Sequence, residues 1–245
     1  MVSRVLLVTG ASRGIGAEIA TRLAGERCHV VVNYREKAKR ADDVAEAVRA
    51  AGGEAVAIRA DVTDEQAVGA MLRDVGQRFG RLDVLVLNAS GGLEPGAEPG
   101  YAMRLNCDAQ VRLAELALPL MPAGGRIVFV TSHLAHFHGS RPVPDDYLPI
   151  ATSKQAGENA LRRMRQAFDA AGVTLVVTSA DMIEGSTMVR LFERRDPDAI
   201  AARRDASGGL PTAAEFASAI VRAIHEPHQS GDTVYVGGSD YLEAP

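Results

Sequence analysis

Thr9-Gly10-Ala11-Ser12-Arg13-Gly14-Ile15-Gly16 follows the apolar run Val5-Leu6-Leu7-Val8 and precedes a run of helical character at 17–24. Glycines at this spacing allow a tight turn, let the backbone approach a pyrophosphate closely and direct a helix N-terminus at its negative charge. Glycine-rich turns also serve as plain connectors, but a strand before this turn and a helix after it favour a binding role. The stretch therefore predicts a dinucleotide site.

Composition limits the classes of protein to which the chain could belong. It has 245 residues, 47% hydrophobic and 24% charged, as in ordinary globular proteins, and we expect 1–245 to form one domain. The net charge of −4 provides no basic field for nucleic acid or an anionic membrane. There is no bilayer-length apolar run or signal-like segment, which predicts a cytoplasmic protein. Cys28 and Cys107 lack metal or redox spacing, so we expect no metal.

Short apolar runs alternate with longer segments of helical period. The expected strands are Val5–Thr9, His29–Asn33, Ala55–Ala60, Val84–Leu87, Ile127–Thr131, Leu175–Thr178 and Thr233–Val236. The expected helices are roughly 14–26, 37–51, 64–79, 99–121, 149–171 and 212–226, with capping boxes at Thr63–Gln66 and Thr212–Glu215. This alternation favours parallel pairing with right-handed crossovers. It predicts one doubly wound, Rossmann-like parallel sheet of about seven strands, with helices on both faces.

Motifs of a known family recur in this frame: Thr9-Gly10, Gly14 and Gly16, then Asp61-Val62, Asn88-Ala89, Asn106, Thr131-Ser132 and Ser153-Lys154. Over nearly its whole length the chain resembles the short-chain dehydrogenases/reductases. The resemblance implies that Asp61 holds an adenine, that Asn88 and Ala89 line the adenosine side, and that Lys154 binds the nicotinamide ribose. It also implies hydride transfer to or from a carbonyl or alcohol carbon, usually in a homodimer or homotetramer.

Charge at the end of the second strand distinguishes the two nicotinamide cofactors. An acidic residue there favours NAD(H), and cations favour the 2′-phosphate of NADP(H). The chain has Asn33-Tyr34-Arg35, followed by Lys37, Lys39 and Arg40, with Arg13 in the glycine turn. We therefore predict NADP(H) rather than NAD(H). The predicted cofactor-binding residues are Gly10, Ser12, Arg13, Gly14, Ile15, Gly16, Asn33, Tyr34, Arg35, Asp61, Val62, Asn88, Ala89, Ser90, Lys154, Ile183 and Thr187.

The catalytic region departs from the family pattern, which has a tyrosine four residues before the lysine. Ile150 occupies that position, and the nearest tyrosine is Tyr147, seven residues before Lys154. Pro149 favours a helix that begins near itself, which would leave Tyr147 in the preceding loop. Tyr147 is then either the proton donor, reaching back over the site, or a tyrosine of the loop or the substrate wall.

The remaining predicted catalytic residues are Asn106, Ser132 and Lys154. Ser132, at the end of a predicted strand, could donate a hydrogen bond to a substrate oxygen that gains negative charge. The resemblance implies that Asn106 holds a water that links Lys154 to solvent. The segment 132–154 is about five residues longer than the common family spacing. It contributes His133, His136 and His138, which are alternative acids or structural residues.

A second departure follows the sixth predicted strand. Asp181-Met182 replaces the family's Pro-Gly, and the resemblance suggests that Ile183 and Thr187 lie near the nicotinamide or pyrophosphate. Asp181 and Glu184 would add negative charge near the site. Residues 188–192 would begin a mobile lid, and its arginines could either receive an anionic substrate or form a solvated face: Arg194, Arg195, Arg203 and Arg204.

These observations favour an NADP(H)-dependent carbonyl reductase or alcohol dehydrogenase, of the carbonyl or 3-oxoacyl type, acting on a small molecule. One alternative is a catalytically silent NADP(H)-binding sensor or scaffold, in which Ile150 marks lost chemistry. Another keeps the fold but performs a dehydration or an epimerisation. The sequence does not identify the substrate, because pocket shape decides it within this family.

Overall fold

The computed structural model describes residues 4–24, 28–93, 96 and 98–242. Over these residues one seven-stranded sheet has the order β3-β2-β1-β4-β5-β6-β7, and every neighbouring pair is parallel. The strands are β1 (Arg4–Val8), β2 (Cys28–Tyr34), β3 (Glu54–Arg59), β4 (Val84–Leu87), β5 (Arg126–Ser132), β6 (Thr174–Ala180) and β7 (Asp232–Val236). The predicted doubly wound parallel sheet is confirmed.

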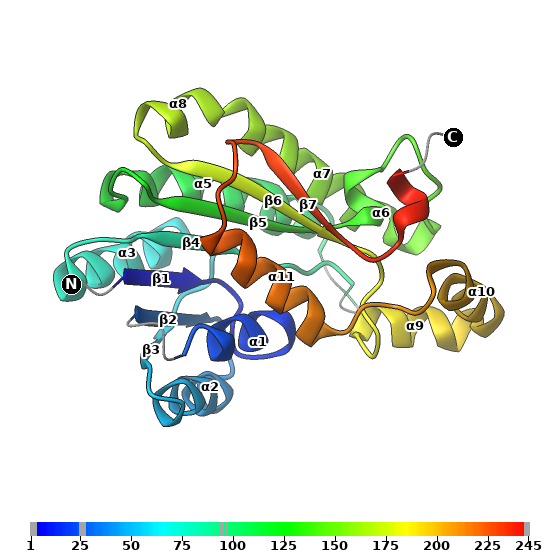
Figure 1. Cartoon of the computed structure of the whole chain (residues 1–245), viewed down its shortest axis with the longest axis horizontal. Helices are drawn as coiled ribbons and strands as arrows, with labels where there is room; N and C mark the ends of the chain where they lie inside the picture. Colours follow the sequence, from blue (N-terminus) through cyan, green and yellow to red (C-terminus); the bar gives the residue numbers. More distant parts are fainter. Residues whose placement is uncertain (1–3, 25–27, 94–95, 97, 243–245) are drawn as a thin grey trace.

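Helices cover both faces of the sheet (Figure 1). One face carries α1 (Gly14–Arg22), α2 (Ala38–Ala50) and α11 (Ala213–His225). The other carries α3 (Glu65–Phe79), α5 (Ala109–Ala117), α7 (Leu148–Arg163) and α8 (Arg165–Ala170). Leu6 and Val8 of β1 join the first core, whereas Val5 and Leu7 join the second, because successive strand side chains point to opposite faces.

Two of the expected helices are interrupted. The segment expected at 99–121 divides into α4 (Tyr101–Met103), a π-helical turn η1 (Arg104–Asp108), α5 and a 3₁₀ turn η2 (Leu118–Leu120). The segment expected at 149–171 divides into α7 and α8. The first expected helix ends earlier than predicted, at Arg22, and its predicted last residues, 25 and 26, lie outside the described residues.

Short elements surround the carboxyl end of the sheet. They are α6 (His133–His136), the 3₁₀ turns η3 (Asp145–Tyr147) and η4 (Ser239–Leu242), and the paired helices α9 (Thr187–Arg195) and α10 (Pro197–Ser207). In Figure 1, α9 and α10 project beside the sheet at this end. Among the described residues, no helix combines the length and the apolar character that a membrane span requires.

One predicted capping box is present and the other is wrong. Thr212 accepts a hydrogen bond from the Glu215 backbone N–H, and the Glu215 carboxylate accepts from the Thr212 N–H. At the start of α3, Asp64 is the N-cap, and its carboxylate accepts from the N–H groups of Gln66 and Ala67. Thr63 instead donates its hydroxyl to Asp61, 2.7 Å away. The predicted N-cap lies one residue before the observed one, because Thr and Asp are both favoured as N-cap residues.

Replacement of Thr212 by alanine should lower the free energy of unfolding by about 1 kcal/mol, because the Glu215 N–H loses its hydroxyl acceptor and the Glu215 carboxylate loses the hydrogen bond from that hydroxyl. Urea unfolding monitored by circular dichroism measures the change. Thr152→Ala, at an exposed position inside α7, serves as the control. A loss at Thr212 no larger than that of the control would contradict a stabilising role for the box.

Candidate functional site

The glycine turn lies at the carboxyl end of β1. The strand order changes direction between β1 and its neighbour β4. Such a switch point is where doubly wound sheets bind ligands. Gly10 and Gly14 have φ values of +62° and +57°. At Gly16 a Cβ would lie 2.6 Å from Asn88 Nδ2 and 2.8 Å from the Gly10 carbonyl oxygen. Only glycine fits at Gly16 without a shift of the turn.

The N-terminus of α1 opens onto this turn. Its N-cap, Arg13, makes no side-chain capping hydrogen bond, and the first turn of the helix carries no acidic residue. The first backbone N–H groups of a helix need partners and attract anions. Around Gly14, no atom would lie within 4 Å of an added Cβ. These properties fit the phosphates of a dinucleotide.

A cleft of about 740 Å³ extends from the glycine turn across the sheet edge. It brings together every predicted cofactor-binding residue except Lys154: Gly10, Ser12, Arg13, Gly14, Ile15, Gly16, Asn33, Tyr34, Arg35, Asp61, Val62, Asn88, Ala89, Ser90, Ile183 and Thr187. Further lining residues that sequence reasoning did not select include Glu36, Tyr101, Leu105, Gly185 and Ser186.

Within this cleft some polar side chains hold the protein itself together. The buried Asn33 accepts a hydrogen bond from Gly10 N at 3.2 Å and donates one to the Ala60 carbonyl at 3.0 Å. Asn88 donates from Nδ2 to the Thr9 carbonyl at 2.8 Å. Asn33 and Asn88 therefore fix the glycine turn against the neighbouring strand ends.

The far end of the cleft is rich in cations. Arg35 donates a hydrogen bond to the Tyr101 hydroxyl and forms an ion pair with Glu36 at 3.0 Å. An adjoining cavity of about 570 Å³ is lined by Arg35, Arg59 and Asp61, among others. Arg59 was missed in the sequence, although it is paired with Tyr34 in the register of β2 and β3. The carboxyl ends of adjacent parallel strands meet at one edge of the sheet. The place of Arg59 near the end of the strand beside β2 could therefore have indicated that it lies near Arg35.

Ser132 and Tyr147 form the second part of the site. Ser132 ends β5, and its Oγ lies 3.2 Å from the hydroxyl oxygen of Tyr147. Tyr147 is not in an open loop as expected, because η3 runs directly into α7, which begins at Leu148. Its ring packs edge-on against Phe192 of α9, with centroids 6.1 Å apart. Ile150, at the usual tyrosine position, is buried in the same apolar cluster.

Burial shifts two pKa values in this region. It raises the pKa of the Tyr147 phenol, although the hydrogen bond with Ser132 acts in the opposite direction. Tyr147 therefore keeps its proton at neutral pH, as a proton donor must. Burial lowers the pKa of the Lys154 ammonium to about 8. Lys154 consequently loses its proton at lower pH than Tyr147.

Asn106 occupies the π-helical turn η1 and contacts protein atoms on two sides. Its Nδ2 donates to the Gly91 carbonyl at 2.9 Å and to Ser153 Oγ at 3.0 Å, and its Oδ1 accepts from Gly91 N. Both amide N–H groups are thus used within the protein. The side chain ties the segment after β4 to α7 next to Lys154.

The three histidines after Ser132 all have partners in the structure. His133 is fully buried and contacts Ser179 Oγ at 2.8 Å and the Gly237 carbonyl at 2.9 Å, and burial lowers its pKa. His136 contacts Glu158 and Tyr235, and His138 contacts Thr152. Among the described residues, no three His, Cys, Asp or Glu side chains gather as a metal site would require.

The expected negative charge from Asp181 and Glu184 is compensated. Arg203 pairs with Asp181 at 2.6 Å, and Arg204 pairs with Glu184 at 2.8 Å. The hydrogen bond from Arg204 lowers the pKa of Glu184. Arg195 pairs with Asp146 beside Tyr147. Arg195, Arg203 and Arg204 therefore pair with the protein's own carboxylates.

Comparisons with known proteins agree with this geometry. A family model described as short chain dehydrogenase matches residues 4–196. 1-Cyclohexenylcarbonyl-CoA reductase of Streptomyces collinus is 33% identical over 99% of this chain and 88% of its own length. Hydroxynaphthalene reductase arp2 of Aspergillus fumigatus is 37% identical over 70% of this chain, and the match spans 63% of that reductase.

Solved structures give the same result. The angucycline C-6 ketoreductase LanV with bound NADP has a TM-score of 0.81 and 27% identity, covering 98% of this chain and 96% of that one. A short chain dehydrogenase from Burkholderia cenocepacia in complex with NADP has a TM-score of 0.79 and 27% identity, covering 96% of each chain. The sheet order, the glycine cleft and these matches agree that the chain belongs to the short chain dehydrogenase family.

Proposed function

We propose that this chain is an NADP(H)-dependent reductase of a small-molecule carbonyl, and in reverse an alcohol dehydrogenase. The Ser132–Tyr147 hydroxyl pair carries the proposal. Because β1 and β5 are parallel members of one sheet, the pair lies at the same edge as the glycine turn. The reductases and NADP-bound structures that resemble this chain support the same activity.

NADPH, when bound along the cleft, would supply hydride to the carbonyl carbon. The Ser132 and Tyr147 hydroxyl groups would donate hydrogen bonds to the carbonyl oxygen, where negative charge develops. As this oxygen becomes an alkoxide, the Tyr147 proton transfers to it and gives the alcohol. Lys154 would hold the nicotinamide ribose, and the helix end at Gly14 would receive the pyrophosphate.

Four cations that line the cleft support NADP(H) over NAD(H). They are Arg13, Arg35, Lys37 and Arg40, and the acidic residues in the same lining are Glu36, Asp61 and Glu184. Arg35 stands at the end of β2, where an acidic residue would instead accept hydrogen bonds from an unmodified ribose. Arg59, in the adjoining cavity, adds a further cation.

Cofactor titration combined with turnover tests the proposal against a silent sensor or scaffold. Fluorescence titration should give tighter binding of NADPH than of NADH, and a panel of ketones and aldehydes should include substrates that oxidise NADPH. Tight NADPH binding without oxidation on any carbonyl would favour the sensor. The Ser132–Tyr147 hydroxyl pair argues for activity. The three histidines after Ser132 contact other protein groups, which favours Tyr147 over a histidine as the acid.

A second candidate function is reduction of a carbon–carbon double bond conjugated with a carbonyl. The relative that aligns over 99% of this chain is named for 1-cyclohexenylcarbonyl-CoA, in which the double bond adjoins a thioester carbonyl. Hydride from NADPH would add to the β-carbon, Ser132 and Tyr147 would donate hydrogen bonds to the enolate oxygen, and a proton from solvent would add to the α-carbon. Proton NMR of the product from 2-cyclohexenone distinguishes the two functions, because conjugate reduction removes the vinyl signals and carbonyl reduction keeps them.

The pH dependence should reveal Lys154. In reduction, kcat/KM for NADPH at a fixed carbonyl concentration should fall above pH 8. Burial lowers the pKa of Lys154 to about 8, so above this pH the ammonium loses its proton and the site loses a positive charge. In Lys154→Arg, residual activity should keep no such fall below pH 10, because arginine stays protonated. The same alkaline fall in this variant would assign it to another group.

We also propose, from the sequence and the family resemblance, that the chain is a single domain working in the cytoplasm as a homodimer or homotetramer. Light scattering coupled to size-exclusion chromatography tests the assembly.

A further inference from the structure

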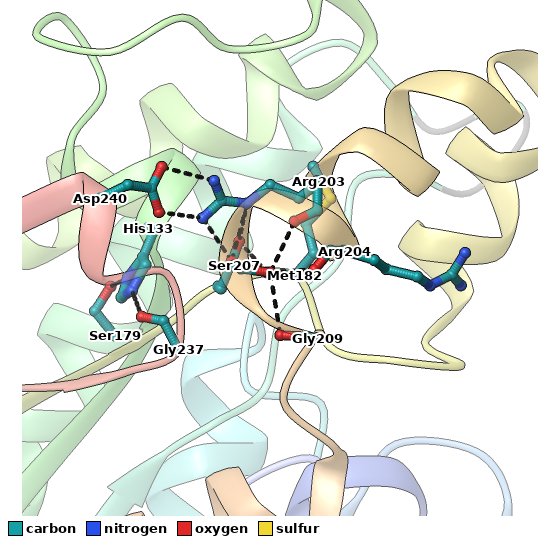
Figure 2. A network of polar contacts seen from close by, with 10 residues as sticks. His133, Ser179, Met182, Arg203, Arg204, Ser207, Gly209, Gly237 and Asp240 are labelled. Atoms are coloured by element: carbon teal, nitrogen blue, oxygen red, sulfur yellow. Dashed lines mark hydrogen bonds and ion pairs between the residues drawn. The ribbon is translucent and has the colours of Figure 1, made fainter.

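Arg203 of α10 joins three segments that are far apart in the sequence (Figure 2). It donates to Asp181, which directly follows β6, from Nε at 3.0 Å and from Nη2 at 2.6 Å. It donates to Asp240, in the 3₁₀ turn η4, from Nη1 at 2.7 Å and from Nη2 at 3.0 Å. Its guanidinium also lies over the ring of Tyr241, 4.7 Å from the centroid. We call this arrangement the Arg203 bridge.

The bridge is shielded from water on its inner side. The side chain of Arg203 is 14% exposed and that of Asp181 is 1% exposed, whereas that of Asp240 is 47% exposed. The planar guanidinium suits two carboxylates at once, because its N–H groups form a rigid fork. The buried Asp181 also accepts a hydrogen bond from Met182 N at 2.7 Å. Asp181 is therefore the fixed anchor, and Asp240 is the outer arm.

The backbone around the bridge leaves no room for another side chain. Gly238 precedes η4 with a φ of +54°. A Cβ there would lie 2.5 Å from Arg203 Nη2 and 2.8 Å from Asp181 Oδ2. The chain after β7 thus passes directly over the Arg203–Asp181 pair, and only glycine permits this approach.

The anchor Asp181 and the helix that carries Arg203 both lead to the proposed site. The anchor Asp181 is followed by Ile183 and Thr187, which line the cofactor cleft. Ile200, one turn before Arg203 on α10, packs in the apolar cluster that contains Tyr147 and Phe192. The bridge therefore attaches the helices that cover Tyr147 to the strand end that leads into the cofactor wall.

We propose that Arg203 is a positioning residue for the reduction: its bridge to Asp181 and Asp240 holds α9 and α10 closed over Tyr147 and so sets the KM for the carbonyl. The kinetic part of this inference rests on the proposed function. The cofactor cleft keeps its own supports, because Asp181 N donates to the Val236 carbonyl at 2.9 Å and Glu184 N to the Pro211 carbonyl at 2.9 Å. Loss of the bridge should therefore act on carbonyl binding more than on NADPH binding.

Three variants open the bridge in different ways. Asp240→Asn weakens the exposed arm. Gly238→Ala places a Cβ against Arg203 Nη2 and Asp181 Oδ2, so that the pair must shift, without removing a charge. The double variant Asp181→Asn/Arg203→Met removes both inner charges, which avoids leaving one buried charge unpaired. Asp205→Asn, an exposed position on α10, is the matched control.

In each bridge variant the KM for the carbonyl should rise about tenfold, with the dissociation constant of NADPH changed less than about twofold, as expected when a lid stays partly open. Amide hydrogen exchange in α9 and α10 should become about tenfold faster, because local opening costs less free energy. Asp205→Asn should match wild type in all three. If the double variant does not fold, Asp240→Asn and Gly238→Ala carry the test.

Unchanged exchange in α9 and α10, or faster exchange with an unchanged carbonyl KM, would overturn the positioning role. An equal loss of NADPH affinity would overturn it as well, since it would indicate a general structural defect. If wild type binds NADPH but reduces no carbonyl, the proposed function fails. The exchange measurement still decides whether the bridge holds the two helices.

Discussion

Replacing Tyr147 with phenylalanine should lower kcat for carbonyl reduction by about 100- to 10,000-fold, the range expected when a positioned proton donor is lost. The variant removes one oxygen, which lies 3.2 Å from Ser132 Oγ, and keeps the ring that packs against Phe192. The apolar cluster should therefore stay intact. Stopped-flow measurement of NADPH oxidation gives the rate.

The affinity for NADPH should be nearly unchanged in this variant, because Tyr147 does not line the cofactor cleft. Tyr235→Phe is the matched control, since it also loses a hydroxyl that contacts a neighbouring side chain, His136. It should turn over at the wild-type rate. Near-normal turnover of Tyr147→Phe would remove Tyr147 from the mechanism and reopen the question of which group supplies the proton.

Gly16→Ala should have the largest effect on the cofactor. Its Cβ would lie within 3 Å of Asn88 Nδ2, the Gly10 carbonyl oxygen and Ala11 Cα, and two of these three atoms are backbone. Overpacking of this kind costs about 1–3 kcal/mol, and the turn must open to relieve it. If that cost falls on binding, NADPH affinity drops about 5- to 150-fold.

Fluorescence titration measures this loss, and circular dichroism checks that the variant is folded. Gly52→Ala is the control, because Gly52 has a φ of +89° but no atom within 4 Å of an added Cβ, and it lies outside the cleft. It should lose some stability and keep its NADPH affinity. Equal affinity in Gly16→Ala and wild type would contradict a binding role for the glycine turn.

The sheet and the cleft at the glycine turn were predictable because their signals are local. Each strand is a short apolar run, and the glycine turn identifies the switch point by itself. Parallel pairing then brings residues after different strands, such as Asp61 and Asn88, to one edge without any further information. Even the error at α3 was local, since Asp64 rather than the neighbouring Thr63 caps the helix.

The substrate side was less predictable because its contacts join distant segments. Asp181 and Glu184 read as uncompensated charges until α10 brings Arg203 and Arg204, about twenty residues later, against them. Tyr147 appeared to precede the helix in a loop, since Pro149 biases only its neighbours and carries no signal for the 3₁₀ turn before it. Asn106 was assigned by resemblance, and its contacts with Gly91 and Ser153 depend on the π-helical turn.

That π-helical turn, Arg104–Asp108, also acts as a phase shift between two walls of the site. Tyr101, just before it, faces Arg35 across the cofactor cleft, while Asn106 inside it faces α7. Gly157 permits this approach, since a Cβ there would lie 2.3 Å from the Asn106 carbonyl. Deleting one residue would restore a regular α-helix and rotate Tyr101 by about 100° relative to Asn106. The extra backbone residue thus lets one helical segment face the cleft at Tyr101 and α7, which carries Lys154, at Asn106.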